Sequence, residues 1–224
     1  MKPRVILAQT IQADGSELVL HEHDARPYLT VDGIQTAGPA TRASEEGLAR
    51  LASSPFRPVR QPRVWIAGLG LGTTVRAIAE ALPQKRGHFH VAEPCPELPG
   101  WLAEHLEIDP LEDRRVTLGR DVGPAGLESA ADPWHLLLVH AETAPLLDRK
   151  RALHEDHRWL TAAYDSLRDG GLLAIAAAKP IPKLEKTLAR VGFEVIRHEI
   201  DIAPKAKKPR LHPLWLARKG RPAD

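Results

Sequence analysis

Three closely spaced glycines stand where an apolar run gives way to a helical pattern. Gly68, Gly70 and Gly72 follow the strand-like residues 64–67 and precede helical spacing over 73–82. Glycine permits unusual backbone angles and lets a ligand approach the main chain. The first turn of the next helix offers free N–H groups to an anionic or polar ligand. The segment therefore predicts a nucleotide- or nucleoside-binding loop, with a tight turn that binds nothing as the alternative.

A carboxylate at the end of the next predicted strand strengthens this interpretation. Glu93 follows the strand-like residues 88–92 and lies 25 positions after Gly68. An acid about 20 residues beyond such a loop binds the hydroxyls of a ribose, although a solvated carboxylate at a strand end is the alternative. The spacing G-x-G-x-G fits the dinucleotide fingerprint G-x-G-x-x-G poorly, because position 73 is Thr. Spacing alone does not separate a dinucleotide from a nucleoside of the S-adenosylmethionine type, and the antiparallel strand pair expected at the end of the chain favours the latter.

The elements that must position these residues form two regions. Residues 4–35 read as short strands separated by the turns Asp14-Gly15 and Asp32-Gly33, which predicts a small antiparallel sheet of about three strands, and a helix opens near Ser44. From residue 63 onward strands and helices alternate, which predicts a parallel sheet covered on both faces. Strands are expected at 64–67, 88–92, 115–118, 135–139, 172–177, 193–202 and 214–217. The last two lack an intervening helix and should be antiparallel.

Composition sets the class of protein. Hydrophobic residues make up 43% and charged residues 27% of the 224 residues, as in a folded globular domain. The 31 basic and 29 acidic residues nearly cancel, which argues against a dedicated nucleic-acid binder. The single cysteine, Cys95, excludes an internal disulfide. No apolar run approaches the ~20 residues of a membrane span, so no membrane partner is expected and a cytoplasmic location is the default.

The order of these motifs resembles the spermidine synthase-like family, a branch of the class I S-adenosylmethionine-dependent methyltransferase superfamily. The resemblance rests on the segments 28–35, 44–46, 68–72, 91–93, 119–122 and 167–174. It implies a Rossmann-like class I methyltransferase sheet of seven strands, the last pair antiparallel, as a domain at 56–224. A small β-rich cap with a helix at 1–55 would precede it. The resemblance also implies S-adenosylmethionine or its decarboxylated form as cofactor, a small-molecule acceptor such as an amine, and a possible homodimer.

The resemblance assigns cofactor-binding roles to residues that match the family pattern. The three glycines would face the donor end of the cofactor, and Glu93 would bind the ribose. Asp121 would accept from the adenine amino group, with Val122 beside the ring. Gln35 resembles the family's glutamine after an Asp-Gly turn, although it lies one residue closer to that turn.

The acceptor side departs from the family pattern. Where the family has an aspartate that holds and deprotonates the attacking amine, this chain has His140, and Glu142 is the nearby acid. Histidine titrates near neutrality and is a candidate base, whereas a strand-end histidine bonded to a loop is the alternative. Ser44 replaces a family tyrosine. Aminopropyl and methyl transfer both remain open, and so does a non-catalytic binding or scaffold protein.

Other constellations carry weaker expectations. The pairs His21/His23 and His88/His90 each place two imidazoles on one strand face, but they lie in separate segments, so no metal site is predicted. Cys95 reads as a packed neutral thiol. The basic residues Lys205, Lys207, Lys208 and Arg210 read as a solvated hairpin loop, with a nucleic-acid methyltransferase as the weaker functional alternative.

Overall fold

The N-terminal part of the chain is a small antiparallel sheet. The computed structural model describes residues 4–148, 150–204 and 206–220. The sheet has the order β1-β2-β3-β4 and is formed by β1 (Val5–Ile11), β2 (Glu17–His23), β3 (Arg26–Val31) and β4 (Ile34–Ala37). The β1–β2 and β3–β4 connections use the Asp-Gly turns, where Gly15 and Gly33 adopt φ values of 82° and 75° that suit glycine, and β2 and β3 are joined at Asp24 and Ala25. The sheet has one strand more than the sequence predicts.

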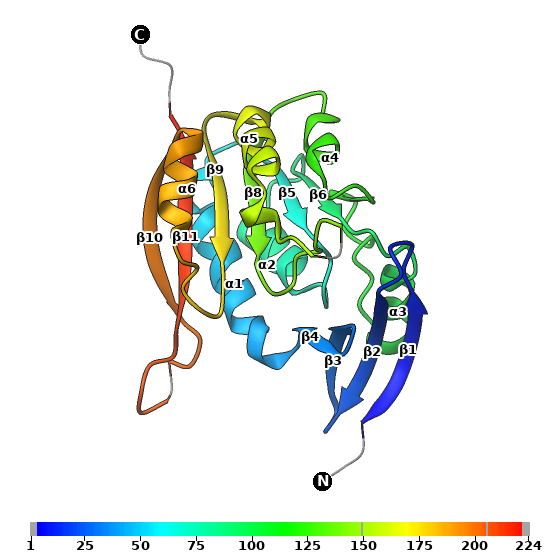
Figure 1. The fold of residues 1–224 in the computed structure, drawn as a ribbon. Coiled ribbons are helices and arrows are strands. Elements are labelled where there is room, and N and C mark those ends of the chain that lie inside the picture. Colours follow the sequence, from blue (N-terminus) through cyan, green and yellow to red (C-terminus); the bar gives the residue numbers. More distant parts are fainter. Residues whose placement is uncertain (1–3, 149, 205, 221–224) are drawn as a thin grey trace.

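The larger part is a seven-stranded sheet of order β10-β11-β9-β8-β5-β6-β7 (Figure 1). Its strands are β5 (Arg63–Ala67), β6 (His88–Ala92), β7 (Val116–Gly119), β8 (Trp134–His140), β9 (Leu167–Ala176), β10 (Phe193–Asp201) and β11 (Leu211–Lys219). Strands β5 to β9 pair in parallel, and β11 pairs antiparallel with both β9 and β10. Every residue of β8 is buried, as expected for the centre of a covered sheet. The predicted class I methyltransferase sheet with an antiparallel last pair is confirmed.

Helices cover both faces of this sheet and define two apolar cores (Figure 1). One core lies under α1 (Pro39–Ser53), α2 (Thr73–Ala81) and α3 (Leu98–Leu106) and includes Leu48, Ile78 and Leu102. The other lies under α5 (His157–Ser166) and α6 (Leu184–Val191) and includes Leu160 and Leu188. The short elements α4 (Pro124–Glu128), η1 (Ser54–Phe56) and η2 (Leu153–Glu155) complete the connections. Among the described residues, no helix has the length and apolar character needed to cross a membrane.

Two elements begin earlier in the chain than the sequence pattern indicates. Helix α1 starts at Pro39, whose fixed φ suits a first helical position, and not near Ser44. It packs against α2 and the large sheet: a Cβ on Gly47 would lie 2.5 Å from Ile200 Cγ2 in β10. Through these contacts α1 belongs to the helices that cover the seven-stranded sheet. Strand β9 starts at Leu167, before Gly170, whose φ of 73° marks an irregularity that glycine tolerates within a strand.

Candidate functional site

A cavity of about 560 Å³ lies between the small sheet and the carboxyl ends of the parallel strands. Its walls come from the β1–β2 turn, β3 and β4, the glycine loop after β5, the residues after β6 and β7, and the segment after β8. The sheet order places β8 and β6 on opposite sides of β5, so the crossover connections diverge at this edge. Ligands of open α/β sheets bind outside the carboxyl ends of the strands at such a switch point.

The glycine loop adopts a backbone that only glycine accepts easily. Gly68, Gly70 and Gly72 have φ values of 82°, 54° and 75°, in the left-handed region. Gly70 lines the cavity, whereas Gly68 and Gly72 do not. The chain itself fills the space that side chains would need, because a Cβ on Gly70 would lie 2.4 Å from Thr143 Cγ2. Glycine at position 70 therefore allows Thr143 to pack closely on the loop, and it also leaves the loop backbone open to a ligand in the cavity.

Glu93 ties the glycine loop to the end of β6. Its side chain is buried and lines the cavity. One carboxylate oxygen accepts from the backbone N–H of Leu69 and the other from the backbone N–H of Cys95, each at 2.9 Å. Burial raises the pKa of Glu93, and the two N–H donors act against that shift. A carboxylate fixed in this way keeps further lone pairs for a ligand hydroxyl.

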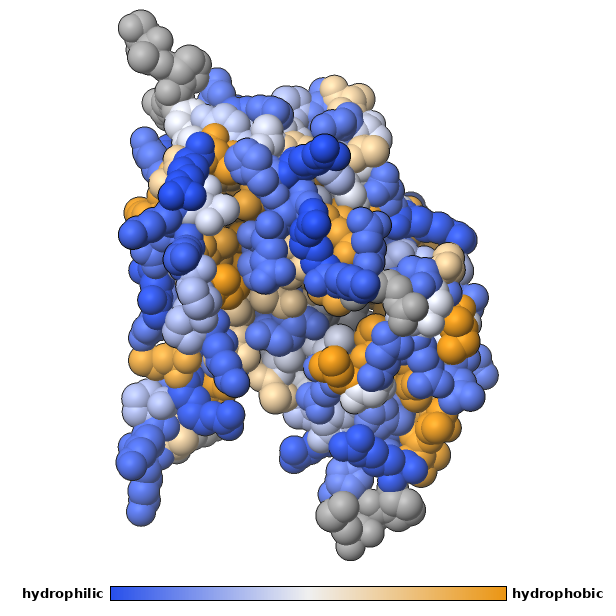
Figure 2. Space-filling view, in the orientation of Figure 1, coloured by the Kyte–Doolittle hydropathy of each residue, from blue (hydrophilic) through white to orange (hydrophobic). Residues whose placement is uncertain are grey.

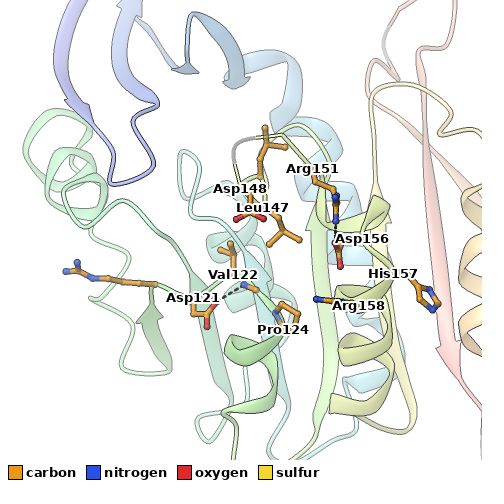
Figure 3. Close-up of a pocket in the computed structure, with 12 residues that line it drawn as sticks. Asp121, Val122, Pro124, Leu147, Asp148, Arg151, Asp156, His157 and Arg158 are labelled. Carbon is orange, nitrogen blue, oxygen red and sulfur yellow. Dashed lines mark hydrogen bonds and ion pairs between the residues drawn. The ribbon is translucent and has the colours of Figure 1, made fainter.

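Asp121 and Val122 follow β7 at the same edge of the sheet. The Asp121 carboxylate accepts from the backbone N–H of Gly123 at 2.7 Å, as Figure 3 shows. Val122 lines the cavity and also a second, open hollow of about 910 Å³. In that hollow Arg151 is paired with Asp156 at 2.6 Å (Figure 3). Because Val122, Leu146 and Asp148 line both spaces, the two hollows are neighbours.

His140 is enclosed by protein groups. It is 3% exposed and does not line the cavity. Its Nε2 lies 3.0 Å from Ser44 Oγ, and its Nδ1 lies 3.2 Å from Thr143 Oγ1 and 3.5 Å from Glu142. Burial lowers the pKa of His140 to about 3, so the ring is neutral at physiological pH. This placement speaks against the base role that the sequence suggests, because the ring reaches no ligand space.

Glu142 lines the cavity at the end of the central strand. Its Oε1 accepts from the backbone N–H of Ala178 at 2.8 Å, while its buried Oε2 has no hydrogen-bond partner among the described residues. Burial lowers the pKa values of His154 and His212, and the negative charge of Glu142 opposes that shift in both. Of the two catalytic candidates that the sequence offers, His140 and Glu142, only Glu142 lines the cavity.

The cavity wall contains acids that sequence reasoning did not select. Its carboxylates come from Glu93 and Glu142, which the sequence selects, and from Asp14, Asp32 and Asp148, which it does not; among the described lining residues none is Lys, Arg or His. Asp14 and Asp32 belong to the two Asp-Gly turns, whose only recognised signal was the turn itself. Gln35, on β4, lines the same cavity. The structure thus brings Gln35, Gly70, Glu93, Val122 and Glu142 together, and leaves Gly68, Gly72, Asp121 and His140 outside the lining.

The weaker constellations lie elsewhere. No group of three or more His, Cys, Asp or Glu side chains within the described ranges is placed to hold a metal. Burial raises the pKa of Cys95 to about 11, which keeps the thiol neutral. Lys207, Lys208 and Arg210 are exposed on the hydrophilic hairpin connection at the lower left of Figure 2, and none lines the cavity. Lys205 lies outside the described residues.

Comparisons with known proteins place the fold. No protein-family model matches the chain, and no curated protein matches it in sequence. Among solved structures, spermidine synthase from Thermotoga maritima superposes with a TM-score of 0.71 at 16% identity, covering 96% of this chain and 73% of that one. A probable spermidine synthase from Corynebacterium glutamicum gives 0.64 at 17% identity, covering 97% and 81%. A predicted O-methyltransferase from Agrobacterium tumefaciens gives 0.55 at 19% identity, covering 80% and 82%. The chain therefore has the fold shared by spermidine synthases and class I methyltransferases.

Proposed function

We propose that this protein is a transferase that binds an S-adenosyl sulfonium donor and passes a carbon group to a small cationic amine. The observation that carries the proposal is the cavity itself. It places Gly70, Glu93 and Val122 beside the further carboxylates of Glu142 and Asp148, and no Lys, Arg or His belongs to the part of its lining that the structure describes. A sulfonium and an ammonium are both cations, and a concave site lined by one sign of charge concentrates ligands of the opposite sign.

The charge of the cavity also favours one form of the donor. Intact S-adenosylmethionine carries a carboxylate, which repulsion from the nearby carboxylates of Glu93 and Glu142 disfavours. The decarboxylated form lacks that group. Of the two transfers that the sequence leaves open, aminopropyl transfer from the decarboxylated donor is therefore the better supported.

The reaction needs one base. The acceptor ammonium first loses a proton to a carboxylate, for which Glu142 is the candidate. The free amine nitrogen then attacks the carbon beside the sulfonium, and the N–C bond forms as the C–S bond breaks. The electron pair of the C–S bond goes to the sulfur, which becomes a neutral thioether. The positive charge ends on the product nitrogen, where the acidic wall accommodates it.

Calorimetric titration tests the proposal with decarboxylated S-adenosylmethionine, S-adenosylmethionine and methylthioadenosine. We expect saturable binding of all three, with the decarboxylated form the tightest. Asp132→Asn is the matched control, since Asp132 pairs with Arg63 far from the cavity and should not change affinity. No binding of any of the three at millimolar concentration overturns the proposal.

One observation favours a second candidate, a non-catalytic relative that keeps the fold. Own-chain atoms fill the space beside each glycine of the loop: Thr143 beside Gly70, Pro145 beside Gly68, and Ile108 beside Gly72. Absence of nucleoside binding in a folded protein would support this candidate.

The homodimer and the cytoplasmic location also stay predictions, and sedimentation of the purified chain tests the homodimer.

A further inference from the structure

The segment 141–146, here called the strap, lies directly on the glycine loop. It follows β8, and all six of its residues line the cavity. A Cβ on Gly70 would lie 2.4 Å from Thr143 Cγ2, and one on Gly68 would lie 2.8 Å from Pro145 Cδ and 3.0 Å from the Thr143 carbonyl oxygen. Atoms this close leave no room for a ligand atom between the strap and Gly70 on that side.

A chain of polar groups fastens the strap from below. Ser44 Oγ lies 3.0 Å from His140 Nε2, and His140 Nδ1 lies 3.2 Å from the Thr143 hydroxyl. The Thr143 hydroxyl donates in turn to the carbonyl oxygen of Thr36 at 3.4 Å. A neutral imidazole with its proton on Nδ1 completes this chain, accepting from Ser44 and donating to Thr143. The chain links α1, the end of β8 and the small sheet through one buried ring.

We propose that His140 is a positioning residue that holds Thr143 against Gly70, so that a ligand's donor end reaches the side of Gly70 that faces Thr143 only after the strap lifts. The identity of that ligand rests on the proposed function, whereas the fastening of the strap does not. Glu142 belongs to the same strap: its Oε1 accepts from the N–H of Ala178, and its Oε2 lies 3.5 Å from His140 Nδ1. Lifting the strap therefore moves the candidate base, which couples donor binding to the placement of Glu142.

The fastening is tested without any ligand by hydrogen exchange of the backbone amides of residues 69–72. Thr143→Val keeps the side-chain shape but removes the hydroxyl, and it should speed this exchange by about 3- to 10-fold, as expected for one lost hydrogen bond. His140→Ala should act alike, and His140→Asn should restore part of the protection through its amide. Thr117→Val removes a Thr–His hydrogen bond of 3.1 Å to His90, at a distant site, and is the matched control. Exchange in Thr143→Val and His140→Ala equal to that of the wild type overturns the proposal.

A reversible crosslink tests the consequence for binding. A Cβ on Gly70 would lie 3.9 Å from Thr143 Cβ, within the range that a disulfide spans, so the pair Gly70→Cys and Thr143→Cys should lock the strap when oxidised. We expect the oxidised form to bind methylthioadenosine at least 10-fold more weakly than the reduced form, with each single variant insensitive to reductant. Equal affinity in both redox states overturns the proposal. If neither the reduced form nor the wild type binds the nucleoside, the proposed function fails, and the exchange experiment still decides the strap.

Discussion

The two walls of the cavity differ in how the chain builds them. The sheet wall presents Gly70, Glu93 and Val122, each within three residues of the end of one of the parallel strands β5, β6 and β7. The opposite wall presents Asp14 and Asp32 from turns of the small sheet, with the strap between them and the first wall. Residues at strand ends meet because parallel strands share an edge. Residues on turns of another sheet meet them only through tertiary packing.

This difference also separates the two halves of the proposed reaction. The sheet wall carries the groups that suit a nucleoside, and the opposite wall together with the strap carries most of the acids that suit an amine. Buried strands back the sheet wall, since β8 is buried along its whole length. The strap is the piece that belongs to the acceptor half but packs on the donor half. Changes that act on one wall and spare the other are therefore the informative ones.

The largest effect is expected at the acid nearest the reaction. Glu142→Gln keeps an oxygen to accept from the Ala178 N–H but removes the proton acceptor, and should lower turnover by about 10²- to 10⁴-fold, the usual range for a general base. Donor affinity should change little. Steady-state kinetics and donor titration measure both, with Asp132→Asn as the control. Unchanged turnover in Glu142→Gln would contradict the assignment of Glu142 as the base.

A methyl group on the glycine loop should strain the contact between the two walls. Gly70→Ala forces a side chain into φ 54° and against Thr143, at a cost of about 2–4 kcal/mol from left-handed strain and overpacking. Gly33→Ala is the matched control, because it has φ 75° but open space around a Cβ, and should cost only about 1–2 kcal/mol. Urea unfolding of both variants measures the difference. Equal losses would mean that the strap yields freely.

Acid should weaken the structure around His140. Because burial lowers the pKa of His140 from 6.5 to about 3, the unfolded chain binds a proton below about pH 6.5 that the folded chain refuses. The stability from the neutral ring is present above pH 6.5 and is lost as pH falls toward 3. At pH 5.5 the free energy of unfolding is lower by about 1 kcal/mol for this reason. Urea unfolding at pH 7.5 and 5.5 should show a smaller acid loss, by this amount, in His140→Asn.

A variant at a second buried histidine distinguishes an effect on the strap from the general sensitivity of the fold to acid. Burial and the positive charge of Arg168 lower the pKa of His135 to about 4, and this residue lies at the other end of β8. His135→Asn should reduce the acid loss similarly without changing exchange in the glycine loop. An acid loss in His140→Asn as large as in the wild type would contradict the neutral buried ring.

The acids of the small sheet should act more weakly, because they lie near solvent. Asp14→Asn and Asp32→Asn keep oxygens for the backbone N–H groups of Ser16 and Glu17, and each should raise the KM for a diamine acceptor by about 2- to 5-fold. The effect should shrink at high salt. Asp24→Asn, an exposed change outside the cavity, is the control. Kinetics at two salt concentrations measure it, and identical KM values in all three variants would remove these acids from the acceptor wall.

The smallest effect is expected at the basic hairpin. Replacing Lys207, Lys208 and Arg210 by Gln should leave donor and acceptor affinity within error, because these side chains are exposed and line neither hollow. Titration of the triple variant checks this. Salt-sensitive RNA or DNA binding that vanishes in the variant would instead favour the nucleic-acid methyltransferase.

The sheet and its donor edge were predictable from local sequence. Apolar runs such as 135–139 indicate buried strands, helical spacing separates them, and Gly70 and Glu93 fall at strand ends by position alone. The missing helix between the last two strands indicates their antiparallel pairing, which the structure has. These features depend on neighbours a few residues away, so the chain carries their signal directly.

The acceptor wall and the state of His140 were decided by the tertiary structure. In the sequence His140 is a candidate base like any other histidine, and only the approach of Ser44, 96 residues away, together with burial makes it a neutral link. Asp14 and Asp32 read as turn residues until the small sheet packs over the strand ends and directs them into the cavity. Charge, burial and close packing depend on which distant segments come into contact, and the local periodicity of the sequence does not encode those contacts.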